Sequence, residues 1–198
     1  MSAERLSGWI QRFADRHGPL TWSATDDGGA RIEAADGAVA VVRLAIEPPA
    51  ELEMPTVSAA ASGFDRFGLV LVRRGGFAIG RIEDGRVVAS RTGTRYVQGQ
   101  TKAGGQSQKR FARRRANQAA ALVRSAAEAV DEVLGEWSAP VVGGGDRALV
   151  RQVLAGARTD LAPRLVPRWL SVGNPRRRDL DEAVDAARAA RISLNALA

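Results

Sequence analysis

The chain has 198 residues and a mass of 21.0 kDa, and its 45% apolar and 26% charged residues are typical of a folded globular protein. It contains no cysteine and a single histidine, His17, which excludes disulfides, thiol nucleophiles, Cys/His zinc sites and histidine-based triads. No apolar run reaches the roughly 18–20 residues of a membrane helix, and residues 1–11 lack the apolar core of a signal peptide, so we expect a cytoplasmic protein.

Positive charge is concentrated in one part of the chain. The sequence has 29 Lys and Arg against 22 Asp and Glu, a net charge of +7. Residues 85–127 hold ten basic residues and no acidic one, so the remaining residues carry 19 basic and 22 acidic side chains. Such a segment suits an RNA backbone, because each neutralised phosphate releases counterions. The alternative is a solvated arginine-rich face, although such faces usually mix signs.

The first third of the chain predicts a small helical and β-rich extension. Apolar residues at helical spacing predict a helix over residues 3–16. Short strands separated by Asp/Gly turns follow, over residues 20–25, 30–34 and 38–46. The Pro-, Ala- and Ser-rich residues 47–62 indicate a linker or an irregular crossing segment. We therefore expect an extension over residues 1–60, followed by a second domain over residues 61–198.

The second domain begins with three strands. A continuous apolar run over residues 67–72 predicts a strand buried on both faces. Turns at Arg73-Arg74-Gly75-Gly76 and at residues 83–86 separate it from strands over 77–82 and 87–90. Residues 91–105 are glycine-rich and basic and predict a long loop, which in a compact domain is usually functional.

The rest of the domain alternates helices and strands. Residues 106–137 predict the longest helix, with apolar residues on one face and arginines, including Arg113 and Arg124, mostly on the other. A strand over 139–142 should end at a glycine run, and Asp146 should cap the next helix. The remaining elements are a strand over 165–171, placed near a sheet edge by Pro167, and a helix over 179–191. The order of elements predicts an α/β fold with a mixed β-sheet and flanking helices.

The tripeptide Gly104-Gly105-Gln106 lies at the end of the basic loop and at the start of the long helix. Two glycines allow the backbone to approach a substrate without a Cβ clash. The Gln106 N–H could stabilise an oxyanion while its amide side chain orients a water or a ribose hydroxyl. These groups fit an ester or phosphodiester at an RNA end. The alternative is a flexible glycine loop in which Gln106 only lies near the helix N-terminus.

Two other features of the sequence bear on function. No nearby side chain offers a general base, so chemistry would need assistance from the substrate or a site completed by a large partner. Gly143-Gly144-Gly145-Asp146 resembles a phosphate-binding strand–loop–helix but lacks the Lys and Ser/Thr of a nucleotide loop, so we expect a structural role for it.

The strand run 67–72, the hairpin, the Gly-Gly-Gln loop and the helix with Lys109-Arg110-Phe111-Ala112-Arg113-Arg114-Arg115 resemble the catalytic middle domain of eukaryotic and archaeal class I release factors. They are more similar to the release-factor-like peptidyl-tRNA hydrolases of the Vms-like (VLRF) family, in its actinobacterial branch. The resemblance spans about residues 63–191 and implies a release-factor middle-domain fold with ribonuclease H-like layering. Residues 1–60 are not explained by it.

The resemblance implies codon-independent release of nascent chains from peptidyl-tRNA on stalled ribosomes, by cleaving either the peptidyl ester or the tRNA 3′ end. It implies catalysis by Gln106 with Gly104 and Gly105, and no metal or organic cofactor. The expected partners are peptidyl-tRNA and the large ribosomal subunit, with no membrane, and the sequence does not reveal the oligomeric state. The expected RNA-binding residues are Arg91, Arg95, Lys102, Lys109, Arg110, Arg113, Arg114 and Arg115. Rival functions are a non-catalytic ribosome- or RNA-binding module and a small-molecule hydrolase.

Overall fold

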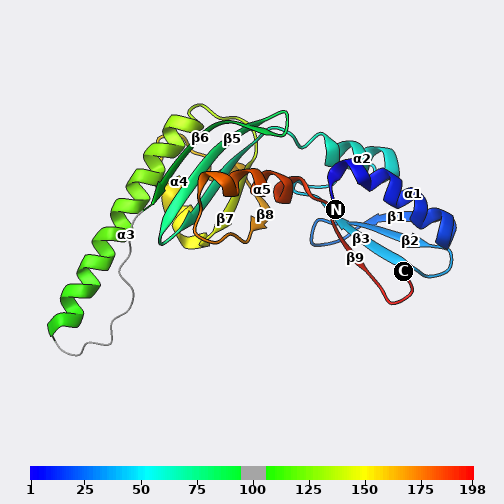
Figure 1. The fold of residues 1–198 in the computed structure, drawn as a ribbon. Coiled ribbons are helices and arrows are strands. Elements are labelled where there is room, and N and C mark those ends of the chain that lie inside the picture. The colour runs from blue at the N-terminus through cyan, green and yellow to red at the C-terminus, as the bar shows by residue number, and fades with distance from the viewer. Residues whose placement is uncertain (95–105) are drawn as a thin grey trace. The chain divides into compact units, whose positions relative to one another are not determined.

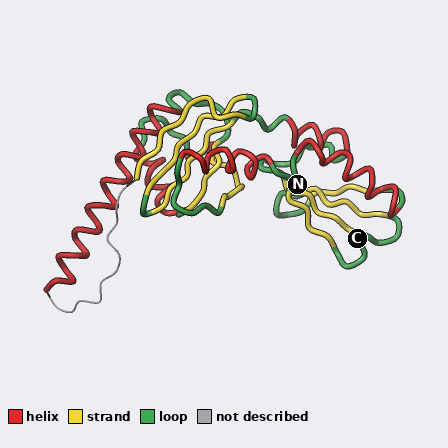
Figure 2. Tube along the Cα trace, in the orientation of Figure 1, coloured by secondary structure: helices red, strands yellow, loops and turns green. Residues whose placement is uncertain are grey.

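A computed structural model describes residues 1–94 and 106–198 of the chain. The residues form two compact units (Figures 1 and 2). Unit 1 comprises Met1–Asp65 together with Asp185–Ala198, and unit 2 comprises Arg66–Val184. Each unit has its own sheet and its own hydrophobic core.

Unit 1 contains a four-stranded antiparallel sheet, sheet A, in the order β1-β2-β3-β9. Alternate residues of β2 and β3 face a core that they share with the apolar faces of α1 and α2. A short 3-10 turn, η1 (Ala3–Arg5), leads into α1. The elements are α1 (Leu6–His17), β1 (Leu20–Ala24), β2 (Ala30–Ala34), β3 (Val39–Arg43), α2 (Met54–Ser62) and β9 (Arg191–Leu194).

Helix α2 occupies part of the segment for which the sequence indicates a linker or irregular structure. Its proline, Pro55, lies in the first turn, where the missing N–H costs no helical hydrogen bond. Glu53 and Thr56 cap the helix reciprocally, and the alanines that follow are strong helix formers. Val57 and Ala61 lie one turn apart and are buried. Packing of this face therefore produces a helix where composition favoured a linker.

The C-terminal segment also differs from its prediction. The helix expected over residues 179–191 is α5 (Arg177–Arg188), and the chain then forms β9, which pairs antiparallel with β3. Asn195 extends this pairing, because its side chain accepts a hydrogen bond from Val39 N at 3.0 Å and donates one to Gly37 O at 3.0 Å. The end of the chain thus completes the sheet of the N-terminal unit.

Unit 2 confirms the predicted mixed α/β fold. Its five-stranded sheet, sheet B, has the order β6-β5-β4-β7-β8, with β4, β5 and β6 antiparallel and β4, β7 and β8 parallel. Strand β4 is buried over Phe67–Val72, as its apolar run predicts, and β8 with Pro167 lies at an edge. The strands are β4 (Phe67–Arg73), β5 (Gly76–Glu83), β6 (Arg86–Thr94), β7 (Val141–Gly145) and β8 (Leu165–Leu170).

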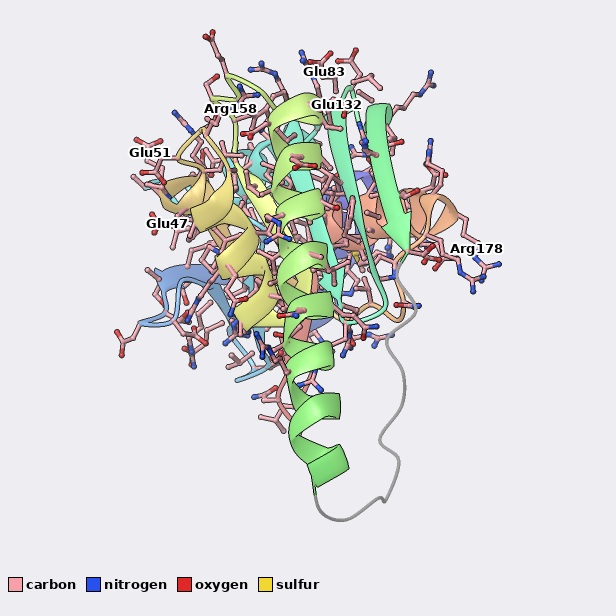
Figure 3. All side chains as sticks on the ribbon, turned by 90° about the vertical axis from the view of Figure 1, so that its left-hand side faces the viewer. Glu47, Glu51, Glu83, Glu132, Arg158 and Arg178 are labelled. Atoms are coloured by element: carbon pink, nitrogen blue, oxygen red, sulfur yellow. The ribbon has the colours of Figure 1, made fainter. Side chains whose placement is uncertain are left out.

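Helices cover both faces of sheet B. On one face, α3 (Gln106–Val133) and α4 (Arg147–Gly156) share a core with Val70 and Ile79, and Figure 3 views this face. On the other face, Leu180 of α5 packs at Gly80, where an added Cβ would lie 3.2 Å from its Cδ2. A 3-10 turn, η2 (Ala162–Arg164), precedes β8. This layering agrees with the α/β arrangement expected from the order of elements.

The glycine run lies inside β7 instead of following it. A side chain on Gly143 would collide with the Trp169 ring, and one on Gly144 would come within 2.7 Å of Leu71 Cδ2. Gly145 has a φ of 87°, and an added Cβ there would collide with the Val72 carbonyl oxygen. The three glycines therefore permit close packing of neighbouring strands and a left-handed turn into α4, which agrees with the expected structural role.

Candidate functional site

Helix α3 carries most of the predicted site residues and is anchored by its C-terminal half. Among its described side chains, the buried ones run from Leu122 to Val133, and they pack in the core with β4, β5 and α4. Of the apolar face expected from the sequence, Ala126, Val130 and Val133 are buried, whereas Ala119 and Val123 are half-buried. Burial thus falls off toward the N-terminal half of the helix.

The outward face of α3 is polar and basic where it is described. Arg113, Asn117, Ala120 and Arg124 are exposed, and their spacing of three or four residues places them in one stripe. In Figures 1 and 3 the N-terminal half of the helix extends beyond the sheet. Arg113, whose side chain is described in this half, is therefore available to a large ligand.

The N-terminal half of α3 extends beyond the edge of sheet B at which β6 ends (Figures 1 and 3). The register pairs Gly76, the first residue of β5, with both Arg73 of β4 and Thr94 of β6, so these two strands end at the same edge on either side of β5. Strand β7 runs parallel to β4 and ends at the same edge, with Val72 paired to Gly145. Glu83 and Glu132, labelled in Figure 3, mark the opposite end of the sheet. Thr94, the last residue of β6, therefore lies at the edge beyond which α3 extends (Figure 3).

The predicted catalytic residues fall at the limit of the described chain. Gln106 is the first residue of α3, as the predicted helix start requires. Gly104 and Gly105 lie outside the described residues, as do Arg95 and Lys102. Four predicted RNA-binding residues of α3 have a helical backbone but side chains outside the described part of the structure. They are Lys109, Arg110, Arg114 and Arg115.

Arg91 has a partner within the protein. Its guanidinium, on β6, forms an ion pair with the Glu132 carboxylate on α3, and both side chains are exposed by more than half. The pair links the edge strand to the helix, and surface pairs of this kind are worth about 0–1 kcal/mol. Glu132 was not among the residues predicted from the sequence, although an acid in the last turn of a basic helix is a signal for such a pairing.

Charge along α3 runs against the helix dipole. The helix has no acid in its first turn and no base in its last turn, whereas its acids, Glu128, Asp131 and Glu132, lie near the C-terminus. Acids stabilise helix N-termini and bases stabilise C-termini by about 0.3–1 kcal/mol each at low salt. The observed arrangement is therefore unfavourable for the isolated helix. A polyanion bound to the N-terminal half would relieve the repulsion among its bases.

The part of the chain that the structure describes contains no metal-binding cluster. Within residues 1–94 and 106–198, no group of three or more His, Cys, Asp or Glu side chains could hold a metal ion. His17 belongs to α1, where its Nδ1 lies 2.8 Å from Asp36 Oδ2. Hydrogen bonding from the Ala38 N–H and from His17 lowers the pKa of Asp36. The interaction of His17 with Asp36 links the end of α1 to the β2–β3 turn within unit 1.

None of the helices in the described ranges is long and apolar enough to cross a lipid bilayer.

The fold and the helix together define a class of protein: an α/β domain that presents a basic helix beyond one edge of a mixed sheet. Residues 65–193 match the family model of the Actinobacteria/chloroflexi VLRF1 release factor. Because the match covers well over half of the chain, the protein belongs to this family. The family indicates a release-factor type of function in translation, in association with the ribosome. Among curated proteins, no sequence matches the chain.

Proposed function

We propose that this protein releases nascent chains from peptidyl-tRNA on stalled ribosomes or large subunits, independently of the codon, as part of ribosome quality control. Its family and the position of Gln106 support the proposal. Gln106 is the first residue of a helix that sheet B anchors at its other end. This position is the observation that carries the proposal, because it places Gln106 at the end of a long helix, far from the core that holds the other end. The protein would act in the cytoplasm.

In this mechanism the protein supplies an amide and positive charge. Gly104 and Gly105 allow the backbone to approach the 3′-terminal adenosine, and Gln106 positions the attacking water or hydroxyl. A single donor directed at a developing oxyanion is worth roughly 10²–10³ in rate. Proton transfer is left to a hydroxyl of the tRNA or to the ribosome, which makes the site a composite one.

The basic residues would hold the RNA. Phosphates of the tRNA acceptor stem or of ribosomal RNA would contact the arginines of α3, of which Arg113 is exposed. Arg91 would contribute less than the others, because Glu132 already neutralises it. This surface is expected to bind RNA whichever bond the protein cleaves.

The decisive experiment is Gln106→Ala, assayed on purified stalled ribosome–nascent chain complexes. We expect release to fall about 10²-fold or more while the variant still co-sediments with ribosomes. Gln118→Ala is the matched control, because Gln118 is a glutamine of the same helix, half-buried and twelve residues further on. Its release rate should stay within about twofold of wild type.

The same reactions distinguish the alternatives. If release by Gln106→Ala equals that of wild type, Gln106 has no part in the mechanism. If wild type binds ribosomes but releases nothing, the non-catalytic binding module replaces the hydrolase, a reading that the basic face of α3 favours. Sizing the tRNA product identifies the bond, because ester hydrolysis leaves the 3′ CCA end intact and cleavage of the tRNA removes it.

A further inference from the structure

A hollow of about 560 Å³ opens at the edge of sheet B where β4 and β7 end. Three segments far apart in sequence line it: the β4–β5 turn, the junction of β7 and α4, and the connection from β8 to α5. Its lining residues are Arg73, Arg74, Gly75, Asp146, Gly173 and Asn174. The carboxyl ends of adjacent parallel strands are the usual place for ligands in α/β sheets.

Two arginines provide the hollow with positive charge. Arg73 and Arg74 are exposed, and no ion pair of the described residues engages either of them. The Arg73 Nε donates to the Val172 carbonyl at 2.9 Å, which orients the guanidinium and leaves its two terminal nitrogens for a ligand. Adjacent guanidinium groups recognise phosphate through charge-assisted, often bidentate, hydrogen bonds.

Asp146 provides an acceptor of fixed position. Its Oδ1 accepts hydrogen bonds from the backbone N–H groups of Ala148 and Leu149, at 2.9 and 3.1 Å, and its own N–H donates to Val72 O at 2.8 Å. Its Oδ2 accepts no hydrogen bond from the described part of the chain. A carboxylate repels phosphate, so this free oxygen suits a ligand hydroxyl instead.

The walls of the hollow are held rigidly. The Trp169 indole N–H donates to Gly145 O at 3.1 Å, and the Arg147 guanidinium lies 4.4 Å from the centre of the Trp169 ring. Asn174 packs so closely on Gly75 that a Cβ there would collide with its amide. Gly173, by contrast, has no atom within 4 Å of an added Cβ. The site is thus preformed, with open space at one lining residue.

We propose that this hollow binds a ribonucleotide, with the phosphate on Arg73 and Arg74 and a ribose hydroxyl on Asp146. The arginines of the β4–β5 turn supply the charge that the glycine run and Asp146 lack on their own. The ligand is either a free mononucleotide or one residue of an RNA strand, since the site recognises the chemistry that both share. The hollow lies at the edge of sheet B where β6 ends and beyond which the N-terminal half of α3 extends (Figure 3), which favours encounter with RNA.

Binding to the full-length chain is tested by calorimetric titration with adenosine 5′-monophosphate, its 2′,3′-dideoxy analogue, inorganic phosphate and a six-nucleotide oligoribonucleotide. We expect saturable binding of the monophosphate or the oligoribonucleotide. Arg73→Ala and Arg74→Ala should each weaken it about tenfold or more, the usual loss for a charge-assisted hydrogen bond. Asp146→Asn retains the helix cap, and it should abolish any preference for the monophosphate over its dideoxy analogue.

Two further variants keep the test independent of folding. Gly173→Leu has room for its side chain and should obstruct the hollow without lowering the unfolding temperature. Arg86→Ala is the matched control, because Arg86 is exposed and lies at the opposite end of β6. It should bind like wild type.

The results separate the two sources of the ligand. Binding of the monophosphate shows that a free nucleotide suffices, and binding of the oligoribonucleotide alone assigns the site to an RNA strand. The proposal is overturned if neither binds, if the arginine variants bind normally, or if inorganic phosphate binds as tightly as the monophosphate. Gln106→Ala should leave this binding unchanged, so failure of the proposed release activity and failure of this site are distinguishable.

Discussion

Gly145 occupies a tightly constrained backbone position of unit 2. Its φ of 87° lies in the left-handed region, and an added Cβ would collide with the Val72 carbonyl oxygen. The following N–H, that of Asp146, donates to the same carbonyl at 2.8 Å. The turn from β7 into α4, and with it the position of Asp146 in the hollow, therefore depends on the absence of a side chain here.

We expect Gly145→Ala to lower the free energy of unfolding by about 2–4 kcal/mol, because it combines backbone strain with a steric clash. Urea denaturation of both proteins measures the change. Gly173→Ala is the control, since nothing lies near its Cβ, and it should stay within about 0.5 kcal/mol of wild type. Equal stability of Gly145→Ala and wild type would show that the β7–α4 turn relaxes without cost.

In helix α3, stability of the helix and binding of a polyanion favour charges of opposite sign near the N-terminus. Its anchored half packs a buried stripe on the sheet, as its apolar pattern predicts, although its acids lie near the C-terminus, where the dipole favours bases. Its N-terminal half has bases where the helix dipole favours acids, and Lys109 and Arg110 lie in the first five residues. A sequence selected only for helix stability would place acids there. This arrangement is consistent with binding to a polyanion.

The double variant Lys109→Glu/Arg110→Glu is expected to stabilise the helix and to weaken ribosome binding. The dipole contributes about 0.3–1 kcal/mol per site, so amide hydrogen exchange in the first turns of α3 should slow. Ribosome co-sedimentation should fall, with a shallower dependence on salt, because fewer phosphates are neutralised. Arg151→Glu, an exposed arginine on α4, is the control. Undiminished binding of the double variant would remove this half of α3 from the RNA surface.

At the scale of the whole molecule, the two ends of the chain fold as one unit. β9 forms the edge of sheet A, Ala190 is buried in the core of unit 1, and Asn195 bonds to the β2–β3 turn and to β3. Unit 2 is therefore an insertion between two parts of unit 1 in sequence. The family match extends through residue 193 and so includes most of β9.

Deleting residues 189–198 should unfold unit 1 while unit 2 remains folded, because the core of unit 2 lies entirely within Arg66–Val184. Hydrogen exchange followed by mass spectrometry should show lost protection in β1, β2 and β3 and retained protection in β4. Asn195→Ala is the milder variant, which keeps β9 and should cost about 1–2 kcal/mol for its hydrogen bonds. Full protection of sheet A in the truncated chain would refute this dependence.

Elements with a local signal could be predicted from the residues alone. The sequence predicts β4 and α3 because burial of a strand on both faces gives a continuous apolar run, and burial of one helix face gives apolar residues at helical spacing. Asp146 as a helix cap followed from its position before an apolar run, and the order of elements predicted the mixed sheet. The acid-free segment and the Gly-Gly-Gln tripeptide were equally visible in the sequence, because a charge count and a motif need no partner.

Tertiary structure decided the features that depend on distant partners. Because of Pro55 the sequence did not predict α2, which the burial of Val57 and Ala61 stabilises. The four residues of β9 form a strand because they pair with the edge of β3. The hollow joins Arg73, Asp146 and Asn174 across about one hundred residues of sequence. No local sequence pattern predicts that these three residues lie close together, because they become neighbours only when the strands of the whole sheet have assembled.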